Sequence, residues 1–137
     1  MKKISKKTIT GRVGSWMTYL SHLGVGHWTI ECVIVESPDG NDSSAACVHS
    51  MSDYDHALLE FNRSWLAKSD WPTIDKVIIH EILHMVFRDY DEAIAQVNSH
   101  LNIPVKQIWH QGIEHELEGV IERISRQLYE LHCAEVV

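Results

Sequence analysis

The stretch "TIDKVIIHEILHMVFRDYD" at residues 73–91 sets charged and imidazole side chains inside an apolar helical repeat. Pro72 and Thr73 are residues that begin helices, and the repeat predicts a helix that runs to about Arg88. Its apolar members recur at the spacing of one helix face: Ile78, Ile79, Ile82, Leu83 and Val86. Because such a face is buried in a core, the polar residues of the same turns point to another surface.

Two histidines and a glutamate occupy that other surface, in the segment "HEILH" at 80–84. His80 and His84 are four residues apart, so they lie one above the other on a helix and can hold one metal ion. Glu81 lies about 100° further round, where it can reach a water on that ion without being a ligand itself. The pattern HExxH therefore predicts a zinc site with Glu81 as general base.

A chance match is the alternative interpretation, because the chain holds 10 histidines in 137 residues. At the frequencies of His and Glu in this chain, the expected number of accidental HExxH matches is about 0.06. In this alternative, His80 and His84 are ordinary polar residues of an amphipathic helix, and the chain binds no metal.

A catalytic zinc ion takes a third protein ligand, and one common source of that ligand is excluded here. The extended pattern HExxHxxGxxH needs glycine at 87 and histidine at 90, where this chain has Phe87 and Tyr90. The other common source is a carboxylate on a later helix. Glu118 fits that role in the segment "EGVIE", and Glu122 is placed one turn further on to orient a ligating histidine.

Other choices of third ligand stay open from the residues alone. Glu114, with Glu118 behind it, is the nearest rival of the pair formed by Glu118 and Glu122. Glutamates at this spacing are also the usual pattern of a solvated helix face. Further candidates lie just past the motif or near the last helix: His110, His115, Asp89 and Asp91.

The first half of the chain predicts a helix followed by a small sheet, so that the whole is a single α+β domain over residues 1–137. The first strand is mostly apolar on both sides past Glu31, which is typical of a strand covered on two faces. The helix is expected over about 7–22, and the three strands over 27–36, 45–51 and 56–65.

The second half predicts helices only. After the HExxH helix, a short helix is expected over 91–101, with a break at Pro104. A long last helix then reaches about residue 132, with Gly112 as a kink or as its start. Its apolar face consists of Ile113, Leu117, Val120, Ile121, Ile124, Leu128 and Leu131.

Composition narrows the class of protein. No apolar run approaches the roughly 18 residues that span a bilayer, and the basic start "MKKISKKTIT" lacks the apolar segment of a secretory signal. We therefore expect no membrane partner. The net charge of −7 argues against nucleic acid as a partner. Three scattered cysteines without a CxxC pair favour a reduced, cytoplasmic protein.

The order of the motifs resembles the gluzincin metallopeptidases, in which HExxH is followed on a later helix by a glutamate and a second acid. The resemblance implies that His80, His84 and Glu118 bind Zn²⁺, that Glu81 is the general base, and that Glu122 stands where the family usually has aspartate. The layout is similar to a small zincin-like domain. The segments "LGVGHWTIECVIV" and "VIIHEILHMVF" also resemble uncharacterised phage and prophage proteins with a minimal zincin core.

The expected function is a zinc-dependent hydrolase that acts on a peptide or protein, with Glu81 taking a proton from the attacking water. Candidates to stabilise the oxyanion are His110, His115 and Tyr90. The strand "HALLEFN" at 56–62 is a candidate to pair with an extended peptide. A zinc-binding interaction module without catalysis is the alternative function. The pattern predicts neither the specificity nor the oligomeric state.

Overall fold

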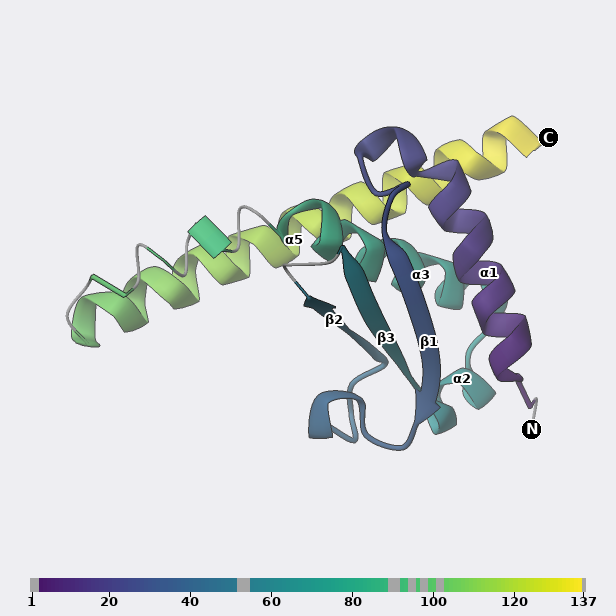
Figure 1. Ribbon diagram of the computed structural model, residues 1–137, viewed down its shortest axis with the longest axis horizontal. Helices are drawn as coiled ribbons and strands as arrows, with labels where there is room; N and C mark the ends of the chain where they lie inside the picture. The colour runs from purple at the N-terminus through teal and green to yellow at the C-terminus, as the bar shows by residue number, and fades with distance from the viewer. Residues whose placement is uncertain are drawn as a thin grey trace.

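The computed structural model describes residues 3–51, 55–88, 92–93, 96, 99–100 and 103–136, and the side chains at 51, 103, 105–110, 114 and 136 lie outside that description. The helix expected over 91–101 falls mostly outside these residues. In the described part the chain is a mixed α+β domain, as expected, with a three-stranded sheet and a long C-terminal helix (Figure 1).

The sheet consists of β1 (Thr29–Val35), β3 (His56–Asn62) and β2 (Ala46–Met51), in that spatial order. β1 pairs with β3 in parallel, and β2 pairs with β3 antiparallel. The one-turn helix η2 (Pro38–Gly40) lies in the connection between β1 and β2. Since β3 is the central strand, the expectation that it accepts an added peptide strand is wrong. The strand at the edge beside the HExxH helix is β2.

Helix α1 (Lys6–Tyr19) precedes the sheet and begins at Ser5, whose hydroxyl accepts a hydrogen bond from the backbone N–H of Thr8. A short 3₁₀ turn, η1 (Ser21–Leu23), continues it. Gly24 ends this turn with a φ of 86°, a conformation that only glycine adopts without strain. The expected helix over 7–22 is therefore confirmed, with its last residues in the 3₁₀ turn.

The sheet is followed by α2 (Arg63–Lys68), α3 (Trp71–Val86) and, further along the chain, α5 (Ile103–Val136). The prediction that the third strand continues through "RSW" is wrong, because the strand ends at Asn62 and α2 begins at Arg63. The side chain of Asn62 caps α2 by accepting a hydrogen bond from the backbone N–H of Trp65. α3 is the expected HExxH helix. α5 begins at Ile103 and continues through Gly112, so this glycine is neither a kink nor a start.

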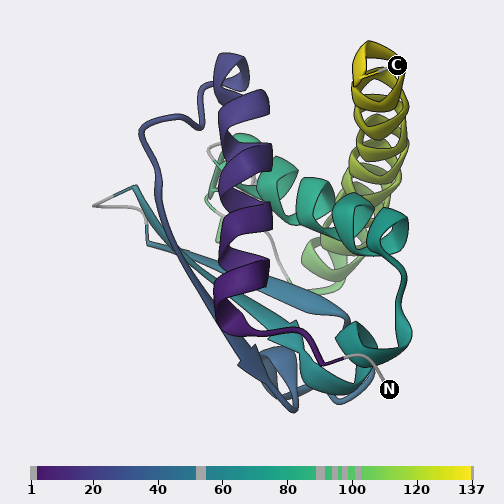
Figure 2. The ribbon, with the colours of Figure 1, turned by 90° about the vertical axis from the view of Figure 1, so that its right-hand side faces the viewer.

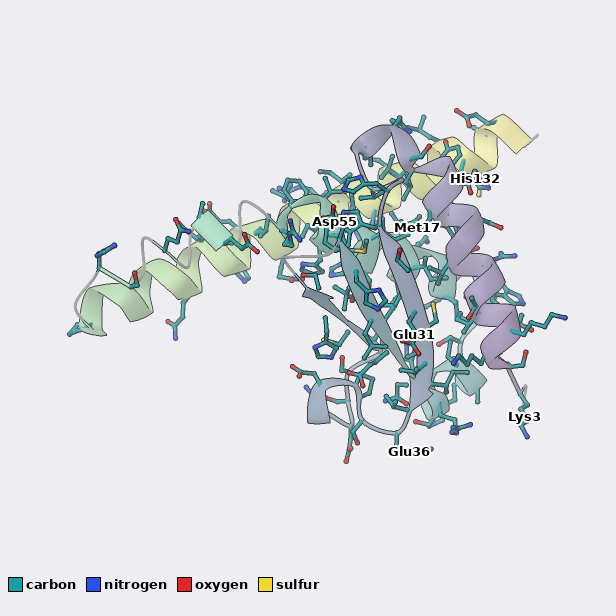
Figure 3. The ribbon with its side chains drawn as sticks, in the orientation of Figure 1. Lys3, Met17, Glu31, Glu36, Asp55 and His132 are labelled. Carbon is teal, nitrogen blue, oxygen red and sulfur yellow. The ribbon has the colours of Figure 1, made fainter. Side chains whose placement is uncertain are left out.

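One face of the sheet carries the core, and the other does not. Ala57, Leu59 and Phe61 of β3 are buried beneath α1 and α3, on the side where Figure 2 shows the helices. On the opposite face Thr29 and Glu31 of β1 are exposed, and Glu31 is labelled there in Figure 3. The expectation of a strand covered on two faces is wrong, because no described helix covers this second face.

Helix α5 packs its apolar stripe against α3. Ile121 is fully buried, and Leu117, Ile124 and Leu128 pack against the same core. Leu131 was expected on this face but is 57% exposed, because in this turn of α5 it is His132 that packs on α1, with its ring 4.6 Å from that of Trp16. No helix among the described residues is long and apolar enough to cross a membrane.

A buried carboxylate ties α1 to α3. Asp75 is 4% exposed and accepts two hydrogen bonds of 2.7 Å from Arg12. Trp16 donates a third, of 3.0 Å, from its indole N–H. These charge-assisted hydrogen bonds satisfy the buried carboxylate and fix the position of α3 relative to α1.

We expect Asp75→Ala to lower the free energy of unfolding by about 3 kcal/mol, because it leaves the buried Trp16 N–H without an acceptor and breaks a buried ion pair. Urea denaturation measures this loss. Asp70→Ala is the matched control, because Asp70 caps the same helix through the Thr73 N–H and its removal costs about 1 kcal/mol. Equal losses in the two variants would show that Asp75 is no more than another helix residue.

Candidate metal centre

Helix α3 presents the two motif histidines on one face, one turn apart. The two Nε2 atoms lie 3.2 Å apart, and the ring centroids are separated by 5.0 Å. The side chains of His80 and His84 are 19% and 23% exposed, so both are largely enclosed yet open to a small ion. This face is opposite the fully buried Ile78, Ile79 and Ile82, which anchor the helix.

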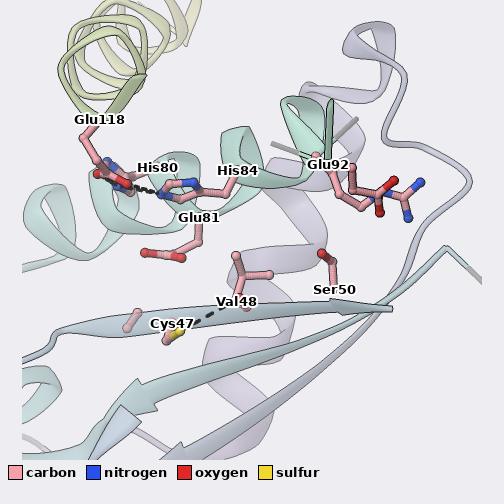
Figure 4. A pocket seen from close by; sticks show the side chains of 10 residues that line it. Cys47, Val48, Ser50, His80, Glu81, His84, Glu92 and Glu118 are labelled. Carbon is pink, nitrogen blue, oxygen red and sulfur yellow. Dashed lines mark hydrogen bonds and ion pairs between the residues drawn. The ribbon is translucent and has the colours of Figure 1, made fainter. Parts of the chain in front are cut away.

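Helix α5 brings Glu118 to the same point. Its Oε2 lies 3.2 Å from the Nε2 of His80, and its Oε1 lies 3.0 Å from the Nε2 of His84. Figure 4 shows Glu118 extending from α5 to the two histidines of α3. Leu117 and Ile121 lie beside Glu118 on α5, and both pack in the core next to α3. Their packing therefore determines how close Glu118 comes to α3.

The donor set fits zinc in chemistry and in size. Two imidazole nitrogens and one carboxylate oxygen all lie within 4.8 Å of one another. Zinc bonds of about 2.0–2.2 Å in a tetrahedron separate donor atoms by about 3.3–3.6 Å. The observed separations of 3.0–3.2 Å need only a small opening to admit the ion. Three protein ligands would leave a fourth position for water or substrate.

Glu122 lies behind the first histidine, as the spacing suggested. Its Oε2 is 3.2 Å from the Nδ1 of His80, while the Nε2 of the same ring faces Glu118. An acceptor at Nδ1 selects the tautomer in which the Nε2 lone pair is free for a metal. The other oxygen of Glu122 is 3.1 Å from both Nε and Nη2 of Arg126, one turn further along α5.

Glu81 points away from its two neighbours in the motif and toward β2 (Figure 4). It is only 8% exposed. Burial, and secondly the charge of Glu118, raises the pKa of Glu81 to about 8, while a hydrogen bond from the backbone of Val48 opposes the rise. Burial disfavours the charged form of this carboxyl, so the group holds a proton more readily than an exposed glutamate does.

The site opens into a pocket of about 610 Å³ between β2, α3 and α5. A second pocket, of about 630 Å³, adjoins it and shares Ala46, His80 and Glu81. The residues of the first pocket are Ala46, Cys47, Val48, Ser50, His80, Glu81, His84, Arg88, Glu92 and Glu118. The two pockets flank Glu81 on either side, so the candidate metal centre lies along a groove at the edge of the sheet.

The rival ligands are not brought to this site by the part of the chain that can be described. His115 is exposed and does not belong to the group of three donors. The side chains of Glu114, His110, Asp89 and Asp91 lie outside the described residues, as does the oxyanion candidate Tyr90.

Strand β2 also contributes to the site, although no feature of the sequence predicted it. The backbone of Val48 contacts Glu81, and Cys47 lines the pocket beside it. Burial and the nearby charges of Glu81, Asp39 and Glu60 raise the pKa of Cys47 to about 11. A thiol with this pKa stays protonated at neutral pH, so Cys47 is a poor nucleophile and a poor metal ligand. Nothing in the spacing of "AACVHSM" indicated which strand would border the site.

No protein-family model matches this chain, and neither a curated protein nor a solved structure shows significant similarity to it.

Glu118→Ala is expected to weaken zinc binding at least about 100-fold, because it removes one of three donors and leaves only the histidine pair. Competition with a chromogenic chelator measures the affinity. Glu116→Ala is the matched control, since Glu116 is an exposed glutamate of the same helix outside the donor group. An affinity that survives Glu118→Ala would assign the third ligand elsewhere, and His84→Ala then tests the motif itself.

Glu122→Gln is expected to weaken zinc binding about 10- to 100-fold without changing the stoichiometry, because its carboxylate orients His80 rather than forming part of the donor group. The same chelator competition, run beside metal analysis by mass spectrometry, separates affinity from stoichiometry. A stoichiometry that falls with Glu122→Gln would make Glu122 itself a ligand.

Proposed function

We propose that this chain is a zinc-dependent hydrolase of the gluzincin type that cleaves peptide bonds. The observation that carries the proposal is the convergence of His80, His84 and Glu118 from two helices, with the buried Glu81 beside them in an open groove. The chemistry of the donors favours zinc, because imidazole and carboxylate together suit this ion.

His80, His84 and Glu118 would hold the ion, with Glu122 fixing the ring of His80. Bound zinc supplies a positive charge that polarises a carbonyl and makes water acidic near neutral pH. Glu81 takes the proton of the attacking water through its carboxylate and passes it to the leaving amine as the bond to the carbonyl carbon breaks. Its burial and its contact with Val48 keep this carboxylate aimed into the groove.

An extended peptide suits the shape of the site better than a compact small molecule. The groove follows β2, an edge strand of the described sheet, and its two pockets meet at Glu81. An edge strand offers main-chain hydrogen bonds to an added strand, which gives affinity that does not depend on the side chains of the substrate. The scissile bond would then cross the metal centre.

A zinc-binding interaction module that does not catalyse is the alternative. It requires the same three donors but has no use for a buried carboxylate whose pKa is raised to about 8. Burying an ionisable group costs stability, and a site that only holds a metal would gain nothing from it in return. For this reason we favour the hydrolase.

Glu81→Gln should retain the zinc stoichiometry of the wild type and lower peptide cleavage at least about 1,000-fold, because the amide has the same shape but cannot accept the proton. Mass spectrometry of a mixed peptide library measures cleavage, and metal analysis checks the site. Residual cleavage at the wild-type rate would refute the mechanism. Zinc binding without cleavage in the wild type would favour the interaction module.

A further inference from the structure

The second pocket differs from the first in its charged residues, and the proposed reaction does not explain this difference. It lies on the side of Glu81 away from Val48 and Ser50, and begins at Ala46, the first residue of β2, and at Ala45 just before it. Its wall is formed by α3 and α5, and its residues are Ala45, Ala46, Thr73, Lys76, Val77, His80, Glu81, Glu122 and Arg126. Any extended chain that crosses the metal centre along β2 must enter this pocket.

The metal-site contacts show how α3 and α5 run past each other. His84 is paired with Glu118, and His80, one turn earlier on α3, with Glu122, one turn later on α5. The helices are therefore antiparallel here. One more turn in the same direction leads to Lys76 on α3 and Arg126 on α5, both of which line the second pocket. One helical turn corresponds to about 5.4 Å, or between one and two residues of an extended peptide.

Charge distinguishes the two sides of the groove. Lys76 and Arg126 face only Glu122 in the second pocket, besides Glu81, which both pockets share. In the first pocket Arg88 faces Glu92 and Glu118. Apart from the shared Glu81, the second pocket therefore holds two cations and one carboxylate, whereas the first holds one cation and two carboxylates. Lys76 is exposed, with its ammonium group 5.1 Å from the centre of the Tyr129 ring.

We propose that the second pocket binds a carboxylate side chain of the substrate, so that cleavage occurs within about two residues of an aspartate or glutamate. The inference rests on the proposed function and names its substrate class, peptides with an acidic residue beside the scissile bond. Lys76 would attract the carboxylate of the substrate directly, whereas Arg126 already forms an ion pair with Glu122. A carboxylate held by two cations forms charge-assisted hydrogen bonds that a neutral amide cannot form.

The direction of β2 refines the position of the acid. Ala46, the first residue of the strand, borders the second pocket, and Ser50, near its end, borders the first. A peptide that pairs antiparallel to β2 runs from Ser50 toward Ala46, and its carboxyl-terminal half enters the positive pocket. Antiparallel pairing, which is slightly more stable per residue, therefore puts the acidic residue after the scissile bond.

The test uses a neutral peptide that the zinc-loaded wild type cleaves, with a single Asp or Asn placed in turn at each of the three positions on either side of the scissile bond. We expect Asp to exceed Asn in kcat/KM roughly fivefold at one or two adjacent positions, as for one exposed ion pair. Lys76→Gln should reduce the ratio to about one, and Lys76→Glu should reverse it. Lys68→Gln, an exposed lysine of α2 outside this pocket, should leave it unchanged.

Binding provides a readout that does not depend on turnover. Fluorescent Asp and Asn peptides are titrated against zinc-loaded Glu81→Gln protein, with and without Lys76→Gln. Cleavage without an Asp preference, or a preference that survives Lys76→Gln, overturns this inference and leaves the hydrolase intact. Absence of cleavage, together with Asp-selective binding that requires Lys76, overturns the hydrolase and leaves the pocket. Failure to bind either peptide overturns the inference as well.

Discussion

The ion pair between Asp75 and Arg12 is the constraint on which the rest of the structure depends. It joins α1 to the first turns of α3, so the helix that bears the site is fixed at the end opposite the motif. Trp16 completes the acceptor set, and the same indole ring lies 4.6 Å from His132 of α5, labelled in Figure 3. One buried carboxylate thereby organises contacts among three helices. The position of His80 and His84 follows from it, because a rigid helix transmits the placement of its first turns to its last.

The helical parts of the fold could be predicted from the sequence because their signal is local. Apolar spacing identified α1 and α3 to within a few residues, and Asp70 caps the second where Pro72 had suggested a start. The wrong predictions concern contacts between a segment and distant parts of the chain. Whether the second face of β1 is covered depends on where distant helices pack, and the exposure of Leu131 depends on which side of α5 packs on α1. Periodicity along one segment contains neither fact.

The candidate site likewise contains residues that could be predicted from local spacing and residues that could not. The spacing of His80, Glu81 and His84 predicted a candidate site on α3, and the packing of α5 brings the predicted Glu118 and Glu122 to the two histidines. The partners from β2 could not be predicted, since strand order decides which edge meets α3. The positions of Lys76 and Arg126 in the sequence could have predicted the second pocket. Lys76 is four residues before His80, and Arg126 is four residues after Glu122. This spacing brings the two cations together only if α3 and α5 are antiparallel, which the sequence does not show.

A metal held by His80, His84 and Glu118 would join two helices that meet only in the folded state. α5 packs on α3 through a narrow apolar stripe around Ile121, and the described polar contacts between the two helices include those of Glu118 and Glu122. Without a cation, Glu118 brings a negative charge close to the buried Glu81 and raises its pKa. A bound cation would attract the Glu81 carboxylate, which Glu118 alone repels. Its bonds to His80 and His84 on α3 and to Glu118 on α5 would also join the two helices. By linkage, any ligand that binds only the docked arrangement stabilises it, so metal binding at this site and the packing of α5 on α3 would be coupled.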